Sequence, residues 1–300
     1  MTGLRLPRLW QWLSVAAAVL AWAGSGVGLA ARGQIYGREA VDLADQAVAQ
    51  DIVNLVIVAP LTVLLSVWAR RGSVRAYTAW LGCLAFTAYS YAIYAFSIHF
   101  GPLFLVWVAV LGLAFYALVG ALVSVDAVPV LEWFGRRPMP LAAGWLGVAA
   151  TAFGLLWLSQ IVPDLVAGRA STSAALLDLP TNPVQVLDLA LFLPAVLTSA
   201  ALLLRRRPLG YATAPGVLLF LVLTCLPVLV TPLVALVEGR SPNWGAVVPL
   251  GVVLAATVLV LRRTLRDPRP RDRTVRPGTT RGSAPVLNDP STAPLPEAAP

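Results

Sequence analysis

The stretch DLALFLPAVLTSAALLLRRRPLGY, residues 188–211, decides the fold class. It opens with a carboxylate, continues as an almost wholly apolar run to Leu204, and then carries three arginines in succession. A bilayer core of ~30 Å takes about 20 apolar residues of helix, and a run of this length is too long for an ordinary strand. The stretch therefore predicts a helix that crosses a membrane and ends at its cytoplasmic side, where arginine is enriched.

The composition of the whole chain agrees with this interpretation. Hydrophobic residues make up 58% of the 300 residues and charged residues only 12%, which leaves too few polar side chains to cover a water-soluble globule. We predict an all-α membrane protein with about eight transmembrane helices, at 10–31, 52–69, 76–98, 102–125, 141–162, 184–204, 211–236 and 243–261. The first of these also resembles a cleavable signal peptide, and we favour a retained helix.

The arginines predict the orientation. With the N-terminus inside, the only arginines in predicted outer segments are Arg32, Arg38, Arg169 and Arg240. The positive-inside rule then places both termini in the cytoplasm of a bacterial plasma membrane. The formal net charge of +8 needs no nucleic-acid partner, because the bilayer explains where the arginines lie. The arginine-rich tail is expected to contact anionic lipid headgroups.

A second copy of the opening stretch lies earlier in the chain. A shift of 134 positions aligns NLVIVAPLTVLLSVWARRGSVRAY (54–77) with 188–211, so that Pro60 meets Pro194 and Tyr77 meets Tyr211. Matches of Pro and Tyr are informative in a chain so rich in Leu, Val and Ala. We therefore predict two parallel four-helix repeats. The expected division is a first half at 1–125, a cytoplasmic linker at 126–139, a second half at 140–262, and a disordered Arg/Pro-rich cytoplasmic tail at 263–300.

Asp188 is the leading candidate for a ligand-binding residue, because an ionisable group inside a membrane span is costly. It falls near the outer end of its helix, where a carboxylate is also favoured as an electrostatic cap, and both interpretations stay open. Asn54 aligns with it, and Asp51 lies one turn earlier. Pro60 and Pro194 are expected to kink their helices and free carbonyl groups.

Further candidates lie in TAYSYAIYAFSIHF (87–100). Tyr91 and Tyr94 share one face of the predicted helix with Thr87 and Ile98, at the depth expected for Asp188. They are either part of an interfacial aromatic belt or hydrogen-bond partners of a ligand or of Asp188. His99, the single histidine of the chain, is either a surface group or a sensor of outside pH.

The segment REAVDLADQAVAQD (38–51) combines acidic and apolar residues at helical spacing. It predicts an amphipathic surface helix with a solvated acidic face. The spacing of Asp42 and Asp45 resembles the metal-diphosphate carboxylates of membrane prenyltransferases. No second acidic cluster accompanies these residues, and we do not favour that function.

The usual catalytic motifs are missing from the sequence. There is no HExxH, no glycine-rich phosphate loop and no GxSxG, and one histidine cannot supply a histidine-cluster metal site. We expect no catalytic residues, no metal and no cofactor. The leading hypothesis is a protein that binds or transports a small molecule, ion or lipid through an outward-facing polar cavity. The alternatives are a non-transporting accessory or sensor protein, or an intramembrane enzyme that pairs Asp188 with Tyr91 or Tyr94.

Three segments carry a resemblance to other proteins: LPTNPVQVLDLALFLP (179–194), LLLRRRPLGYATAP (202–215) and YAFSIHFGPLFLVWVAVLGLAFYAL (94–118). They resemble an uncharacterised group of bacterial multi-pass integral membrane proteins over most of residues 50–236. The resemblance implies the same arrangement of spans and no particular activity. Where an Asp would be expected in the first repeat, this chain has Asn54.

Overall fold

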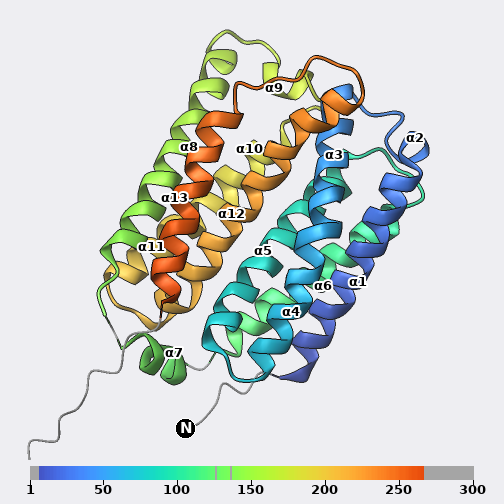
Figure 1. The fold of residues 1–300 in the computed structure, drawn as a ribbon. Coiled ribbons are helices and arrows are strands. Elements are labelled where there is room, and N and C mark those ends of the chain that lie inside the picture. Colours follow the sequence, from blue (N-terminus) through green and yellow to red (C-terminus); the bar gives the residue numbers. More distant parts are fainter. Residues whose placement is uncertain (1–6, 126, 136, 267–300) are drawn as a thin grey trace, which may run out of the picture. The chain divides into compact units, whose positions relative to one another are not determined.

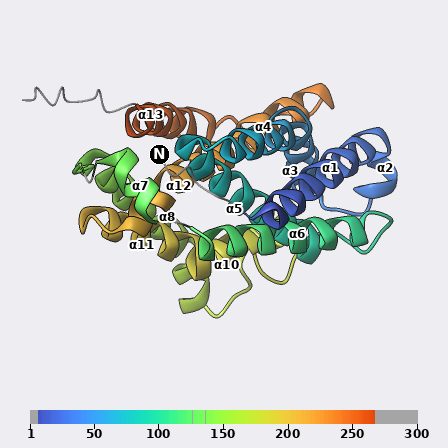
Figure 2. The same ribbon diagram turned by 90° about the horizontal axis from the view of Figure 1, so that it is seen from below.

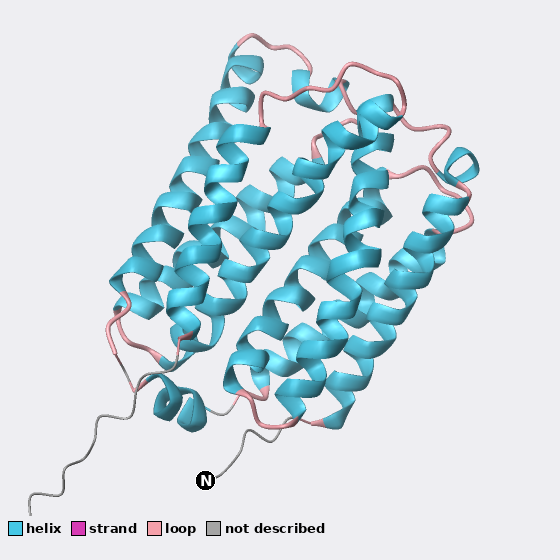
Figure 3. Cartoon of the chain, in the orientation of Figure 1, coloured by secondary structure: helices cyan, strands magenta, loops and turns pink. Residues whose placement is uncertain are grey.

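The part of the chain that the structure describes folds into eight helices long and apolar enough to cross a membrane, as predicted. A computed structural model describes residues 7–125, 127–135 and 137–266 (Figure 1). Every regular element in this part of the chain is helical (Figure 3). The spans are α1 (Arg8–Ala30), α3 (Val41–Val53) continued by the π-helical turn η1 (Asn54–Val58) and α4 (Ala59–Arg70), α5 (Val74–Ser97), α6 (Phe104–Val123), α8 (Pro140–Val166), α10 (Pro183–Leu187) continued by the π-helical turn η2 (Asp188–Phe192) and α11 (Leu193–Leu204), α12 (Pro208–Val237) and α13 (Val247–Leu265). Short helices α2 (Arg32–Ile35), α7 (Ala127–Phe134) and α9 (Thr172–Ala175) lie in the connections.

The second span is longer than predicted, and the expected surface helix at 38–51 is wrong. α3 runs directly into η1 and α4, so that residues from Val41 to Arg70 form one helix. Asp45 and Asp51 of the supposed solvated face are buried. The error has a physical cause: periodicity marks the acidic residues as polar, but it does not show that other segments supply partners that allow them to be buried.

Each π-helical turn ends two residues before a proline. Pro60 and Pro194 are the second residues of α4 and α11, and each follows a five-residue π-helical turn. A proline inside a helix lacks an N–H and its ring collides with the carbonyl group four residues earlier. A wider turn relieves that collision locally. Both prolines are exposed on the outside of the bundle, so they face away from its interior.

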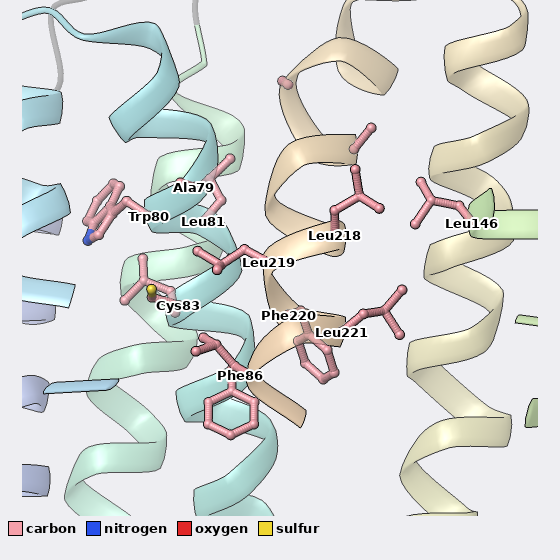
Figure 4. Close-up of a cluster of buried hydrophobic side chains, with 14 of the residues drawn as sticks. Ala79, Trp80, Leu81, Cys83, Phe86, Leu146, Leu218, Leu219, Phe220 and Leu221 are labelled. Atoms are coloured by element: carbon pink, nitrogen blue, oxygen red, sulfur yellow. The ribbon is translucent and has the colours of Figure 1, made fainter. Parts of the chain in front are cut away.

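Helices α5 and α12 cross at the centre of the bundle (Figure 2). A Cβ atom added to Gly82 would lie 2.2 Å from the carbonyl oxygen of Gly216, so the two backbones touch there. Farther along the same pair, the rings of Phe86 and Phe220 meet edge to face at 5.9 Å between centroids. Figure 4 shows the apolar side chains of these two helices, with Trp80 and Leu218 fully buried. Small residues at the crossing let the helices approach closely, which is a common basis of packing in membranes.

The two ends of the bundle differ in charge. We call the end near the first residue of α1 and the last residue of α13 the basic end (Figure 1). Its described arginines are Arg8, Arg70, Arg71, Arg75, Arg137, Arg205, Arg206, Arg207, Arg262, Arg263 and Arg266. The connections at the opposite end hold Arg32, Arg38, Arg169 and Arg240. α7 lies at the basic end, where the ring of Phe134 stacks on that of Tyr211 at 5.5 Å. The second half extends to Leu265, and the predicted disordered tail lies almost entirely outside the described residues.

Candidate functional site

The carboxylate of Asp188 forms hydrogen bonds to two other helices and does not form the hydrogen-bond cap of its own helix. Its Oδ1 accepts a hydrogen bond from the hydroxyl of Tyr89 on α5 at 2.9 Å, and its Oδ2 accepts one from the indole N–H of Trp157 on α8 at 2.8 Å. The residue is 7% exposed. The helix start is capped by Asn182, whose Oδ1 accepts the N–H of Val184 at 3.0 Å. Asn182 rather than Asp188 therefore caps the helix by hydrogen bonds, and both carboxylate oxygens of Asp188 face other helices.

Asp51 forms a second buried carboxylate centre in the first half. Its Oδ2 accepts a hydrogen bond from the hydroxyl of Tyr36 at 2.6 Å, and the hydroxyl of Tyr94 lies 3.0 Å from Oδ1. The residue is 2% exposed. α1 approaches closely enough for this because it carries glycine: a Cβ atom on Gly28 would lie 2.2 Å from Oδ2 of Asp51. Burial, and then the charge of Asp51, raise the pKa of Tyr36 above its ordinary value, so the phenol stays a donor.

Asn54 lies buried one turn farther along and is incompletely satisfied. Its Oδ1 accepts a hydrogen bond from the side-chain amide of Gln50 at 2.8 Å. Its Nδ2, like the hydroxyl of Ser25, is buried without a partner among the described residues. An unpaired buried donor costs about 1–3 kcal/mol. The first half therefore places a carboxylate and an unpaired amide close together in sequence on one buried segment.

Neither carboxylate is neutralised by a basic side chain of the described residues. The ion pairs in this part of the chain are made by other acids, namely Glu39, Asp45, Asp164 and Glu238. Tyrosine hydroxyl and tryptophan indole donors bind Asp51 and Asp188 instead. These two centres place two carboxyl groups inside the helical bundle without a guanidinium partner among the described residues.

The tyrosines divide between the two carboxylates differently from the prediction. Tyr91 and Tyr94 are buried on one face of α5, as predicted, but that face points to the first half. Tyr94 meets Asp51, and the hydroxyl of Tyr91 donates to the carbonyl oxygen of Ala21 at 3.3 Å. Tyr89, on the opposite face, is the tyrosine that binds Asp188. Pairing Asp188 with Tyr91 or Tyr94 as an acid/base pair is therefore wrong.

A cavity of about 130 Å³ lies between the two carboxylate centres, in the half of the bundle away from the basic end. Tyr89 and Tyr94 form part of its wall, and Phe86 lies at its inner end. The other lining residues come from α3, α5, α10, α12 and the residue after α5: Leu43, Gln46, Ala47, Gln50, Ser90, Ile93, Ile98, Val184, Thr224, Pro227, Val228 and Thr231. The lining is mainly apolar, in contrast to the polar cavity expected from the sequence, and the carboxylates stand behind the tyrosines.

His99 lies apart from both carboxylate centres. Its side chain is 50% exposed, and Nδ1 lies 2.9 Å from Oε2 of Glu39. The backbone N–H of His99 also donates to Oε1 of Glu39 at 3.0 Å, in the connection between α5 and α6. His99 is therefore a partly exposed connecting residue, and this geometry joins it to neither carboxylate centre as a candidate ligand-binding residue.

Asp45 also has a structural partner rather than a solvated position. Its two oxygens accept hydrogen bonds from Arg240 at 2.5 and 2.6 Å, which joins α3 to the connection between α12 and α13. These bonds to Asp45 raise the pKa of the Arg240 guanidinium group. Within the described part of the chain no group of three His, Cys, Asp or Glu residues is placed to hold a metal ion.

Three residues of these centres were not singled out from the sequence. Tyr89 and Trp157 lie within the predicted spans 76–98 and 141–162, and Tyr36 lies in the predicted outer connection after the first span. An aromatic side chain that carries one polar atom gives the same sequence signal at an interface and in a core. Tyr89 had one usable signal, because it stands on the face of α5 opposite to Tyr91.

Comparison of the chain with models of protein families, with curated proteins and with solved structures gave no match.

Proposed function

We propose that this multi-pass membrane protein binds a small amphipathic cation in the cavity between α3, α5, α10 and α12. The single observation that carries the proposal is the position of this cavity between two buried carboxylates that lack a basic partner among the described residues. Tyr89 and Tyr94 connect the cavity wall to Asp188 and Asp51. The proposal includes a bacterial plasma membrane as the location and a cytoplasmic basic end.

Charge and shape both favour a cation. Two unit charges ~8 Å apart attract by about 2 kcal/mol at an effective dielectric constant of ~20, and two carboxylates act on the cavity from two sides. The rings of Phe86, Tyr89 and Tyr94 line it, and aromatic faces attract cations. The volume of about 130 Å³ is close to that of an apolar cavity of ~150 Å³ that holds benzene. The ligand is accordingly small, with one positive group and an apolar body.

We further propose that the chain is an internal duplication whose halves move against each other. η1 with α4 and η2 with α11 begin and end 134 positions apart, at the same residues that the sequence shift aligns. Gly82 and Gly216, which touch at the crossing of α5 and α12, are separated by the same 134 positions, as are Phe86 and Phe220. A pair of parallel repeats in contact along one axis supports a rocking motion around a central ligand. This arrangement favours transport over simple binding.

Charge-selective labelling of the cavity tests the proposal. In a background with Cys83→Ala and Cys225→Ala, Thr224→Cys is exposed to a cationic trimethylammonium-ethyl methanethiosulfonate and to its anionic sulfonate counterpart. After each rate is divided by the same reagent's rate with a small free thiol, the cationic reagent is expected to react at least about tenfold faster than the anionic one, which corresponds to ~1.4 kcal/mol. Adding Asp188→Asn is expected to reduce that ratio severalfold, since one of the two charges is gone.

Gln46→Cys serves as the matched control, because Gln46 is exposed on α3 at the edge of the same cavity. Its reactivity ratio is expected to change little with Asp188→Asn. Equal rates for the two reagents at Thr224→Cys would rule out a cation site. They would favour the alternative of a non-transporting accessory or sensor protein.

A further inference from the structure

A second cavity, of about 330 Å³, lies between the halves nearer the basic end. Its lining comes from α5, α6, α11, α12 and η2, and runs from Phe192 and Phe220 to Leu202 and Leu209. The polar atoms beside it are already satisfied within the protein: Ser199 and Thr213 hydroxyl oxygens lie 2.8 Å apart, and Thr213 also donates to a backbone carbonyl. The surface that the cavity offers is therefore apolar.

The cavity opens on the outside of the bundle rather than toward its centre. Ala195 and Thr198 line it and are exposed on α11. Gly82 and Gly216, at the crossing of α5 and α12, are buried residues of its lining. The close approach that these glycines permit leaves no side chain there to fill the space. An occupant that enters from the side enters from the bilayer.

Three arginines stand at the basic end of this cavity. Arg205, Arg206 and Arg207 follow α11, between the lining residues Leu202 and Leu209. All three are exposed. The ion pairs of the described residues involve other basic side chains. Three exposed arginines thus lie in the turn between α11 and α12, the two helices that both line the apolar cavity.

The backbone at Arg206 adds a separate observation. Arg206 has φ +53°, in the left-handed region that favours glycine. At the end of α4 the corresponding position is Gly72, with φ +87°. Both turns have the same hydrogen bonds, since the N–H groups of Gly72 and Arg206 each bond the carbonyl three residues earlier. The second turn therefore carries an arginine at a position where glycine fits with less strain.

We propose that this second cavity binds one anionic phospholipid of the adjacent leaflet, with an acyl chain between α6 and α11 and its phosphate at Arg206 and Arg207. The volume is about twice that of a ~150 Å³ cavity that holds benzene, which suits several methylene groups of a chain. A guanidinium group can donate two parallel N–H hydrogen bonds to two oxygens of one phosphate. The site is separate from the cation cavity and does not depend on it.

Native mass spectrometry of the full chain in detergent tests the lipid site. The protein is titrated with phosphatidylglycerol and with phosphatidylcholine of the same acyl chains, and the affinity of the first bound lipid is measured. Phosphatidylglycerol is expected to bind about fivefold or more tighter. Arg206→Gly and Arg207→Gln are each expected to weaken the affinity for phosphatidylglycerol by about fivefold and to leave the affinity for phosphatidylcholine unchanged. Arg206→Gly relieves backbone strain, so its melting temperature is expected not to fall.

A variant that fills the cavity distinguishes binding of the acyl chain from binding of the headgroup. Ala195→Trp is expected to weaken both lipids, whereas Ala201→Trp, on an exposed position of α11 outside the lining, is expected to weaken neither. Arg71→Gln, at the position aligned with Arg205, is the charge control. Equal affinity for the two lipids, an equal loss with Arg71→Gln, or full binding by Ala195→Trp would each overturn the proposal. Displacement of phosphatidylglycerol by millimolar inorganic phosphate would also overturn it and indicate a free-anion site.

Discussion

Gly82→Ala is the sharpest test of the contact between the two halves. The added methyl group would lie 2.2 Å from the carbonyl oxygen and 2.9 Å from the carbonyl carbon of Gly216. Both atoms belong to the backbone of α12, so no side chain can rotate away, and the helices have to separate. Overpacking of a tight interior costs about 1–3 kcal/mol. A clash with backbone belongs at the upper end of that range.

The expected net effect is a loss of about 2 kcal/mol, because alanine regains up to ~1 kcal/mol over glycine in helix propensity. For a protein of this size that corresponds to a fall of roughly 3 °C in melting temperature. Thermal unfolding of the purified protein in detergent, followed by circular dichroism or by scanning fluorescence of tryptophan, measures it. Gly216→Ala is expected to act in the same direction, since its methyl group would lie 2.7 Å from the carbonyl oxygen of Thr78.

Gly144→Ala is the matched control. Gly144 lies on α8, is exposed, and has no atom within 4 Å of an added Cβ. The melting temperature of Gly144→Ala is expected to equal that of the unchanged protein or to exceed it slightly. If Gly82→Ala and Gly144→Ala have the same melting temperature, then α5 and α12 do not touch at this crossing. The proposed contact between the halves is then refuted.

Two further predictions concern the end of the bundle opposite the basic end. Because burial raises the pKa of Tyr36 in the folded protein, the stability from this phenol is full below its ordinary pKa of ~10 and is lost as the pH rises above it. Tyr36→Phe is therefore expected to lower the melting temperature at pH 7. It is also expected to lessen the fall of the melting temperature between about pH 9.5 and 10.5. If the variant shows the same fall as the unchanged protein over that range, the reasoning is wrong. Removing Arg240 leaves the buried carboxylate of Asp45 unpaired, and because the arginine side chain is 35% exposed we expect a loss of about 1–3 kcal/mol rather than the 3–5 of a fully buried pair. In a double-mutant cycle, Arg240→Gln with Asp45→Asn should lose less than the sum of the single changes; additivity would show that the two residues do not interact.

The sequence indicated many residues of the candidate site, but it did not indicate which side chains hydrogen-bond one another there. Asp188 was selected because an ionisable group inside a membrane helix is costly, Asn54 because it aligns with Asp188, and Asp51 because it lies one turn earlier. Tyr91 and Tyr94 were selected because they share a helix face at the depth expected for Asp188, and all five residues are buried. Their partners could not be selected in the same way, because the helix period gives the face on which a residue stands but not which helix lies opposite that face. For the same reason Asp188, and not Asp51, was considered as a partner of Tyr94.

The sequence by itself determined the class of the protein and the number of its spans. These follow from hydrophobicity and length, which act residue by residue, because lipid accepts only helices whose backbone groups are satisfied internally. The tertiary structure alone decided that Tyr89 and Trp157 bind Asp188, that α3 is part of a span, and that two cavities lie between the halves. These features depend on which helices pack together. In a chain where most residues are apolar, close packing and a few hydrogen bonds between distant segments select that arrangement, and neither has a periodic signal in the sequence.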